Sequence, residues 1–299
     1  MAESVSGGSA PVAKKAWSDL YAGFLSGFIC GVLYQPFDVI KVNMIVLPNS
    51  FHFRERSPWH NLKDICGHIH QTGGPLGFFK GTTVSVLRAS LSSGIYFMIL
   101  RELDAMTNKE RHSKSGNFLN SAFARCAVGL LLNPLGILRT RCQLIDDREY
   151  SRFFNGMAKV FKEEKFRAFT KGSLSMFLEE FPFGGIFNLT YEYINEKGQF
   201  RERNSKAGIF GSALVSGILA ATVTHPAELV RTKIQAQKVD WHRTVKNSVI
   251  LSILVDAYHK YGISGLFKGL QPRLIKKTLV TSSTFFIYEL LIQKQNKLN

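Results

Sequence analysis

Apolar stretches rich in glycine and serine alternate along this chain with strongly charged segments. The apolar stretches are Leu20 to Leu33, Leu91 to Leu100, Ala122 to Leu132, Gly208 to Val223 and Val280 to Ile292. None is an uninterrupted run of the roughly 20 apolar residues typical of an isolated lipid-facing helix. Helices that line a water-filled path keep polar residues on one face. The pattern therefore predicts membrane-spanning helices around a hydrated interior, with a soluble helical protein as the alternative.

Two short motifs recur three times in the same order and at nearly equal spacing. The first surrounds a proline and covers Gln35 to Lys41, Asn133 to Arg139 and His225 to Arg231. The second ends in a Lys-Gly pair and covers Gly77 to Gly81, Ala168 to Gly172 and Gly265 to Gly269. Repetition in step indicates tandem structural repeats. We expect an N-terminal extension over residues 1–16 and repeats over 17–107, 115–198 and 205–295.

Each repeat predicts two long helices and one short one. The segments with a proline near their C-terminal end predict odd-numbered helices over 18–46, 117–145 and 207–237. The segments after the Lys-Gly pairs predict even-numbered helices over 82–105, 173–196 and 270–293. Trp59 to Gln71, Phe153 to Glu164 and Val245 to Lys260 have the amphipathic spacing of helices on a membrane surface. The expected fold is an all-α membrane protein with six transmembrane helices.

These motifs resemble those of the mitochondrial carrier family along essentially the whole chain. The family pattern is Pro-x-Asp/Glu-x-x-Lys/Arg at the end of each odd helix and aromatic-Lys/Arg-Gly at the start of each even helix. The resemblance implies a multi-pass transporter of the mitochondrial inner membrane. It also implies a pseudo-threefold barrel of six helices, with the short helices on the matrix surface and both termini on the intermembrane-space side.

Within the family, the chain is similar to the branch of mitochondrial glycine importers. The shared stretches are Gly94 to Phe97, Pro182 to Ile186, Gly217 to Glu228, and Tyr261 to Arg273. This similarity implies that the substrate is a small amino acid such as glycine.

The net charge and the cysteines limit the kinds of binding partner, metal and cofactor that we expect. The chain has 38 Lys and Arg against 22 Asp and Glu, a formal net charge of +16, and the basic residues are spread along it. Without a zinc-finger, RNA-binding or basic-zipper signature, anionic phospholipid is a better partner than nucleic acid. The four cysteines, Cys30, Cys66, Cys126 and Cys142, lack metal-ligand or redox spacing. We expect reduced core cysteines, and neither a metal nor a cofactor.

The repeated prolines suggest a way to close a pore. A proline inside a helix removes a backbone hydrogen bond and bends the helix. Bends at Pro36, Pro134 and Pro226 would bring three helix ends together, although each proline alone could merely end a helix. The residues two and five positions after each proline lie near one face of their helix. Their charges could therefore meet those of the neighbouring helix.

The family resemblance implies that these charges form a matrix gate. Asp38 would pair with Arg139, and Glu228 with Lys41. Such pairs would break and re-form as the carrier alternates between its two open states.

The middle repeat departs from this pattern because Gly136 occupies the position of the third acid, which leaves Arg231 without that partner. Gln143 and Gln235 lie one helical turn beyond Arg139 and Arg231, where the family often places a glutamine that hydrogen-bonds a gate pair. The matrix gate is therefore expected to be two-thirds complete.

The opposite, cytoplasmic gate departs further from the family pattern of aromatic-Asp/Glu-x-x-Lys/Arg. That pattern falls on Leu100 to Asp104, Tyr191 to Asn195 and Tyr288 to Ile292, where charges are reversed or bases are missing. Either this gate is weak, or Arg101 meets Glu192 or Glu289.

Charged residues also mark a substrate site in the even helices. About two helical turns after the Lys-Gly pairs, these helices carry Arg88, Glu179 and Lys276, and Glu180 and Lys277 follow the last two. The family places its substrate contacts at these positions, and intramembrane charges are functional candidates by default. Arg88 could bind a carboxylate in bidentate fashion, while Glu179 or Glu180 accepts hydrogen bonds from an ammonium group. The alternative is that Glu179 and the lysines pair or snorkel structurally.

Arg125 is a further candidate, since it lies within roughly 40° of the helix face that carries Arg139. Glycine importers resemble this chain at Arg88 and Arg125, but they carry Arg-Asp where this chain has Glu179-Glu180. Glycine stays a leading candidate for the substrate. Because the sign of a charge in the pocket differs, a more cationic amino acid is also a candidate.

The even-helix starts suggest lipid sites. Free N–H groups and the helix dipole favour phosphate at a helix N-terminus. The resemblance implies cardiolipin near Lys80, Gly81, Asn155, Gly156, Lys171, Gly172, Lys268 and Gly269.

Two classes of function remain at this point. The first is a transporter. The second is a non-transporting carrier homologue that serves as a structural or lipid-binding subunit of a larger inner-membrane complex, which Gly136 and the degenerate cytoplasmic gate would favour. An enzyme is not expected, because the chain lacks a nucleophile elbow, a phosphate-binding glycine loop and a metal motif. His52, His68, His70 and His225 are expected to be surface or helix-packing residues.

Overall fold

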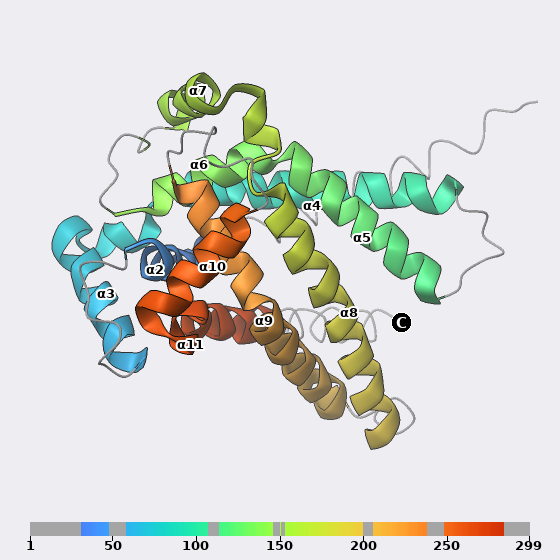
Figure 1. Cartoon of the computed structure of the whole chain (residues 1–299). Coiled ribbons are helices and arrows are strands. Elements are labelled where there is room, and N and C mark those ends of the chain that lie inside the picture. Colours follow the sequence, from blue (N-terminus) through green and yellow to red (C-terminus); the bar gives the residue numbers. More distant parts are fainter. Residues whose placement is uncertain are drawn as a thin grey trace, which may run out of the picture.

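The computed structural model describes residues 31–47, 58–106, 114–145, 150, 153–199, 206–237 and 248–283, and all secondary structure in these ranges is helical. Long helices form the body of the molecule (Figure 1). The short helices α3 (Pro58–Gly73), α7 (Phe153–Glu164) and α10 (Ser248–Tyr261) lie toward one end of it. The short helices thus share an end, as the repeat pattern predicts.

The proline-containing helices take two forms. The first repeat has helical residues 31–33 followed by α2 (Gln35–Val46), and the second has α5 (Lys114–Leu131) followed by α6 (Asn133–Gln143). In both, the proline lies in the first turn of the second piece, where its missing N–H leaves no internal bond unmade. The third repeat has one helix, α9 (Lys206–Ala236), with Pro226 inside it. Of the predicted range 18–46, residues 18–30 lie outside the described residues.

The even-numbered helices begin where the Lys-Gly pairs predict. They are α4 (Thr82–Met106), α8 (Ser173–Gly198) and the helical residues 270–283, while the predicted remainder to 293 lies outside the described residues. Gly81, Gly172 and Gly269 have φ angles of 71°, 76° and 80°. Glycine adopts this left-handed backbone without steric cost, which explains its place in all three turns. The short elements η1 (Pro75–Phe79), η3 (Lys165–Phe169) and α11 (Ile263–Leu266) lead into these turns.

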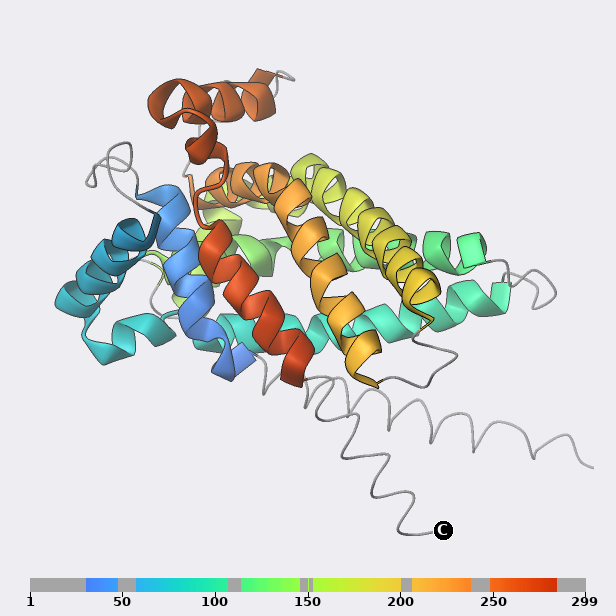
Figure 2. The ribbon, with the colours of Figure 1, turned by 90° about the horizontal axis from the view of Figure 1, so that it is seen from below.

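Each short surface helix buries its apolar face against the proline-containing helix of its own repeat. Burial of these side chains fixes the surface helices in place, because removing apolar area from water stabilises the contact. The buried side chains pair Ile65 and Ile69 of α3 with Val39 and Ile40, Val160 of α7 with Ile137 and Leu138, and Ile253 of α10 with Leu229 and Val230. Figure 2 shows α3 packed beside α2 in this way.

The side chain before each proline fastens the two long helices of its repeat together. In each repeat it bonds to the carbonyl oxygen of the motif lysine, and all three side chains are buried. The bonds join Gln35 Nε2 to Lys80 at 2.6 Å, Asn133 Nδ2 to Lys171 at 2.8 Å and His225 Nε2 to Lys268 at 2.8 Å. Sequence analysis missed this role, although the position before a repeated proline was the available signal.

A fully buried arginine joins α6 to α7 and α9. The Arg141 guanidinium contacts Glu164, lies 2.8 Å from Glu163 Oε2 and donates to the Tyr150 hydroxyl at 3.1 Å. It also donates to the carbonyl oxygen of Gln237 at 3.2 Å. A buried charge is tolerated only when it is paired and its hydrogen bonds are satisfied, and Arg141 meets both conditions.

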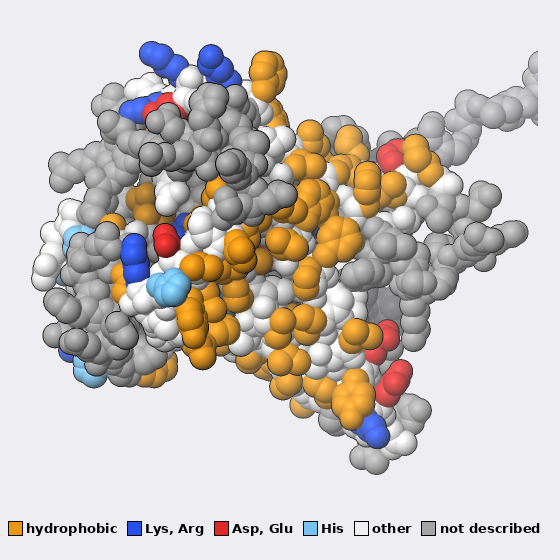
Figure 3. Space-filling model, viewed as in Figure 1, with side chains coloured by type: hydrophobic (Ala, Val, Ile, Leu, Met, Phe, Trp, Pro, Cys, Tyr) orange, Lys and Arg blue, Asp and Glu red, His pale blue; other side chains and the backbone are white. Residues whose placement is uncertain are grey.

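Large hydrophobic side chains are exposed along α8 and α9, and they gather over the middle of the face seen in Figure 3. An exposed apolar surface of this extent marks contact with lipid or with another protein. The exposed side chains on the two helices are Leu174, Leu178, Phe181, Leu189, Tyr193, Val215, Ile218, Leu219 and Val223.

Two helical stretches of the described chain, Pro75–Leu103 and Ala207–Ala236, are long and apolar enough to cross a membrane. Sequence analysis predicted six spans. Within the described residues, the breaks at Tyr34 and Leu132 leave α2 and α6 with 12 and 11 residues. Such helices are shorter than the about 20 residues that cross a bilayer on their own.

We predict that Asn133→Ala destabilises the protein by about 1–3 kcal/mol, because it leaves buried carbonyl groups without a donor. Asn133 Nδ2 donates to the carbonyl oxygens of Ala168 and Lys171, both at 2.8 Å. Thermal unfolding of the purified protein in detergent measures the effect. The control is Ser173→Ala, which removes an exposed turn hydrogen bond to Thr170 and should leave the melting temperature almost unchanged. Equal losses in the two variants would contradict the fastening role.

Candidate functional site

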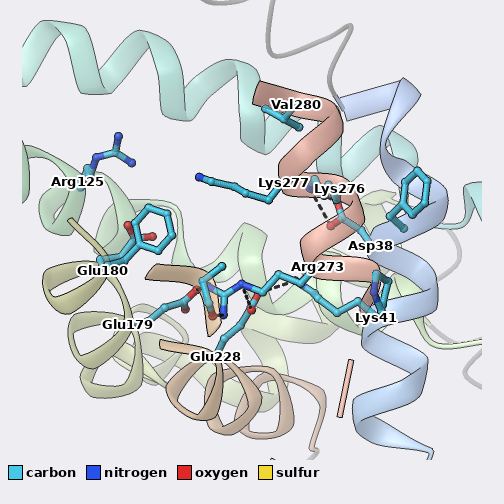
Figure 4. Close-up of a pocket in the computed structure, with 14 residues that line it drawn as sticks. Asp38, Lys41, Arg125, Glu179, Glu180, Glu228, Arg273, Lys276, Lys277 and Val280 are labelled. Atoms are coloured by element: carbon cyan, nitrogen blue, oxygen red, sulfur yellow. Dashed lines mark hydrogen bonds and ion pairs between the residues drawn. The ribbon is translucent and has the colours of Figure 1, made fainter. Parts of the chain in front are cut away.

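Two adjoining cavities lie between the long helices. The larger one, of about 310 Å³, is shown in Figure 4, and a second one of about 140 Å³ extends from it along the proline-containing helices. The two share Asp38, Lys41, Glu179, Glu180 and Glu228 in their linings. Eight Lys and Arg side chains line the two cavities together, against four carboxylates. The site is therefore polar and carries an excess of positive charge.

Two ion pairs at the junction of the cavities join α2 to the proline-containing helices of the other two repeats. Asp38 of α2 pairs with Arg139 of α6, and Lys41 Nζ of α2 lies 2.6 Å from Glu228 Oε1 of α9. Both pairings match those expected from the sequence. Lys276 Nζ adds a second cation to Asp38, at 2.8 Å from each carboxylate oxygen.

Arg231 lacks the gate acid that Gly136 replaces, as expected, but it contacts a different carboxylate. Its Nη1 lies 3.2 Å from Glu179 Oε2, so a carboxylate from α8 replaces the acid that Gly136 does not supply. Glu179 also lies 3.3 Å from Arg273 Nη2. Sequence analysis did not foresee this contact, because it considered only the acids on the proline-containing helices.

Arg273 is a site residue that sequence analysis missed. Its Nε lies 2.7 Å from Glu228 Oε2, and Figure 4 shows its side chain extending from the C-terminal helix toward Glu228. Arg273 is three positions before Lys276, so the two lie near one face of the same helix. This spacing was the signal that could have identified it.

The two glutamines do not hydrogen-bond the ion pairs directly, contrary to expectation. Gln143 Nε2 donates to Ser85 Oγ at 3.2 Å, and Arg139 Nε donates to the same oxygen at 3.0 Å. Gln235 Nε2 donates to Asn133 Oδ1 at 3.1 Å. Gln143 therefore supports its ion pair through a serine hydroxyl, because the amide does not reach the carboxylate.

Some of the predicted substrate residues take part in ion pairs within the protein, and others do not. Lys276 and Glu179 belong to the ion pairs described above, as the structural alternative for these residues expects. Arg88 lines the smaller cavity, and its buried Nε has no hydrogen-bond partner among the residues that the structure describes. Glu180 lines both cavities and makes no ion pair within the described part of the chain.

A third cavity, of about 360 Å³, continues the site away from the ion pairs and includes Arg125 and Lys277 in its lining. The Arg125 guanidinium lies 5.4 Å from the centre of the Tyr96 ring, and Lys277 Nζ lies 4.4 Å from that of Phe183. Contacts at these distances are cation–π interactions. Both cations extend into the space between the helices, as Figure 4 shows.

The residues of the predicted cytoplasmic gate are only partly described. Arg101 is exposed on α4 and Glu192 lies on α8. Glu289, with the whole of 288–292, lies outside the described residues. The alternatives for this gate therefore stay predictions.

Two of the lysines predicted to lie near lipid also contact the following repeat. Lys80 Nζ donates to the carbonyl oxygen of Ile145 at 2.8 Å, and Lys171 Nζ donates to that of Gln237 at 2.9 Å. Each carbonyl follows a proline-containing helix. Desolvation lowers the pKa of the Lys171 ammonium group. These two lysines therefore hold the ends of helices in the following repeat. A phosphate that contacts either lysine would have to leave these hydrogen bonds in place.

The other predicted lipid residues differ among themselves. Asn155 is exposed near the start of α7, whereas Gly156 is buried against Leu138 and Tyr150.

Lys268 Nζ lies over the ring of Tyr261. Desolvation, with a smaller contribution from neighbouring lysines, lowers the pKa of Lys268 to about 7. This group titrates near neutral pH, so its charge depends on its surroundings.

Comparison with known sequences identifies the family. The chain matches the mitochondrial carrier protein family three times, over residues 12–111, 110–201 and 203–297. A mitochondrial glycine transporter B from Danio rerio is 27% identical over 289 residues, which cover 95% of this chain and 97% of the relative. Mitochondrial glycine transporters from Ovis aries and Yarrowia lipolytica are 26% and 25% identical, and cover 91% and 96% of this chain and 88% and 98% of their own.

The three matches are arranged in tandem and together span nearly the whole sequence, as do the individual relatives. The chain therefore belongs to the mitochondrial carrier family, whose proteins lie in the mitochondrial inner membrane and act as transporters of small molecules, not as enzymes.

Proposed function

We propose that the protein transports a small amino acid, with glycine as the first candidate, across the mitochondrial inner membrane by alternating access. The observation that carries this proposal is a charged cavity bordered on one side by ion pairs between repeats. The names of the relatives, which are glycine transporters at 25–27% identity, support the choice of substrate.

The proposal includes six transmembrane helices in a pseudo-threefold barrel, with both termini on the intermembrane-space side. The three tandem family matches and the threefold recurrence of turns, surface helices and fastening bonds support this architecture. In it, α3, α7 and α10 lie on the matrix surface, and the ion pairs beside them form the matrix gate. An even number of spans puts both termini on one side.

Opening the gate requires a compensating interaction. Leaving one member of a buried ion pair unpaired costs about 3–5 kcal/mol. A substrate that carries both a carboxylate and an ammonium group offers a partner to each kind of charge. Gate opening therefore depends on a bound substrate, which prevents an open leak.

The available charges suit a zwitterion. Arg88 brings a guanidinium whose buried Nε has no acceptor among the described residues, and Glu180 brings a carboxylate that lines both cavities. Arg125 and Lys277 add positive charge farther along the path. Arg88 would bind the substrate carboxylate, and Glu180 would accept hydrogen bonds from the ammonium group.

For the gate, we predict that Lys41→Ala and Glu228→Ala each abolish most uptake and lower the melting temperature. A double-mutant cycle between them should give a coupling energy of about 0.5–3 kcal/mol, as for other residues in direct contact. Thermal unfolding with and without substrate provides the measurement. Lys159→Ala is the control, because this lysine forms a half-exposed helical pair at 4.0 Å with Glu163 and should change stability little. Additive effects of the two gate substitutions would contradict the gate.

For the substrate, we predict uptake of glycine or another small amino acid by liposomes that contain the purified protein. Arg88→Ala should reduce this uptake at least about tenfold, because it removes a charge-assisted contact. Glu180→Gln should weaken amino-acid uptake more than uptake of a carboxylate without an ammonium group. Preference for a nucleotide or a dicarboxylate would overturn the assignment. Absence of all uptake by folded, lipid-bound protein would favour a structural subunit of a larger inner-membrane complex.

For lipid, we propose that cardiolipin binds at the three helix starts and at Asn155 and Gly156. Cardiolipin should raise the melting temperature of delipidated protein, whereas phosphatidylcholine should not. Phosphate favours the protonated form of Lys268, whose pKa is about 7 without lipid. Stabilisation should therefore be larger at pH 6 than at pH 8, and Lys268→Gln should reduce this difference. An unchanged melting temperature with cardiolipin would remove the basis of the proposal.

A further inference from the structure

The space beside Gly136 has the properties of an anion subsite. Gly136 stands where the other two repeats carry Asp38 and Glu228. A Cβ atom built on Gly136 would meet no other atom closer than 3.5 Å, and its two nearest neighbours would be Arg88 Nε and Gln235 Nε2. Both neighbours are N–H donors. An oxygen atom placed slightly beyond this point would therefore be within hydrogen-bond distance of both.

These two donors have capacity for a ligand. Arg88 Nε is buried and has no hydrogen-bond partner in the part of the chain that the structure describes, whereas buried donors in native proteins normally have one. Gln235 Nε2 carries two hydrogens and uses one to donate to Asn133 Oδ1 at 3.1 Å. The structure thus places two N–H donors, a buried guanidinium nitrogen and a side-chain amide, beside this space, and the nearest acceptor is Asn133 Oδ1, at 3.8 Å from the built Cβ position.

The surrounding charges also favour an anion. Arg139 and Arg231 line the same cavity as Gly136 and Arg88. The contact of Arg231 with Glu179, at 3.2 Å, is longer than the Lys41–Glu228 contact at 2.6 Å. It is also longer than the about 2.7–2.9 Å of a strong charge-assisted hydrogen bond. Glu179 therefore compensates the missing acid only partly, and it is shared with Arg273.

Cavity size limits the ligand. The cavity has a volume of about 140 Å³, whereas one water molecule occupies about 30 Å³ of liquid. The space admits a carboxylate with a small substituent, and a larger ligand would have to extend into the adjoining cavity.

We propose that the carboxylate of the transported amino acid occupies the space beside Gly136, where it binds Arg88, Gln235 and Arg231. This inference rests on the proposed transport function and adds to it. The substrate itself supplies the third acid of the gate, which the sequence lacks. A bound substrate then completes the ring of ion pairs, and its departure leaves Arg231 with the longer contact to Glu179.

The inference can be tested by thermal unfolding of the full-length protein with cardiolipin, in the presence of potassium acetate, methylammonium chloride or potassium chloride at one ionic strength. Acetate should raise the melting temperature of the wild type, because it provides a small carboxylate. Methylammonium and chloride should not. An equal shift with chloride would show a general anion site and overturn the inference.

Variants at the glycine test the position. Gly136→Asp supplies an internal carboxylate, so it should raise the melting temperature without ligand and weaken the acetate response at least tenfold. Gly136→Asn fills the same space without charge, so it should lose the acetate response without the gain in stability. Gly136→Ala adds only a methyl group at ordinary contact distances and should keep the response. An acetate response in Gly136→Asp equal to that of the wild type would overturn the inference.

Liposome uptake separates the inference from the transport function on which it rests. If the acetate response requires Gly136 but no amino acid is taken up, the anion subsite stands, and its assignment to a transported substrate is overturned together with the transport function. If amino acids are taken up and Gly136→Asp transports them as well as the wild type does, the transport function stands and the subsite is overturned.

Discussion

Charged side chains in the interior of this protein must find partners, and much of its organisation follows from that constraint. Removing an ion from water costs several kcal/mol even after the protein relaxes around it. Asp38 and Glu228 each contact two cations, and these contacts join α2, α6, α9 and the C-terminal helix. The same contacts that neutralise the charges therefore hold helices from all three repeats together. Any rearrangement of the helices has to exchange these partners.

The turns complement the ion pairs because they keep each repeat rigid. A left-handed glycine starts every even helix, and the side chain before each proline bonds to the residue preceding that glycine. The surface helices add buried apolar contacts on the outside of the same region. The two long helices of a repeat are thus fixed to each other at one end. Between repeats, the ion pairs are accompanied by buried apolar contacts such as those of Val42, Leu144 and Ala236.

Repetition explains which features the sequence predicts well. The starts of α4 and α8, the range of α7 and the pairs Asp38–Arg139 and Lys41–Glu228 all follow from motifs that recur in step. The contacts that sequence analysis missed occur once or depend on side-chain reach. Arg231 meets Glu179 because a long side chain extends to a different kind of helix, and Arg141 is buried only because α7 covers it. Periodicity carries no information on either contact.

The lysines of the Lys-Gly pairs give the repeats a direction. Lys80 of the first repeat holds a helix end of the second, and Lys171 of the second holds a helix end of the third. The second and third repeats therefore each receive a terminal hydrogen bond from the repeat before them. In both contacts the anchoring lysine precedes in the chain the helix end that it holds, so the order of the repeats in the sequence is also the order in which one repeat supports the next.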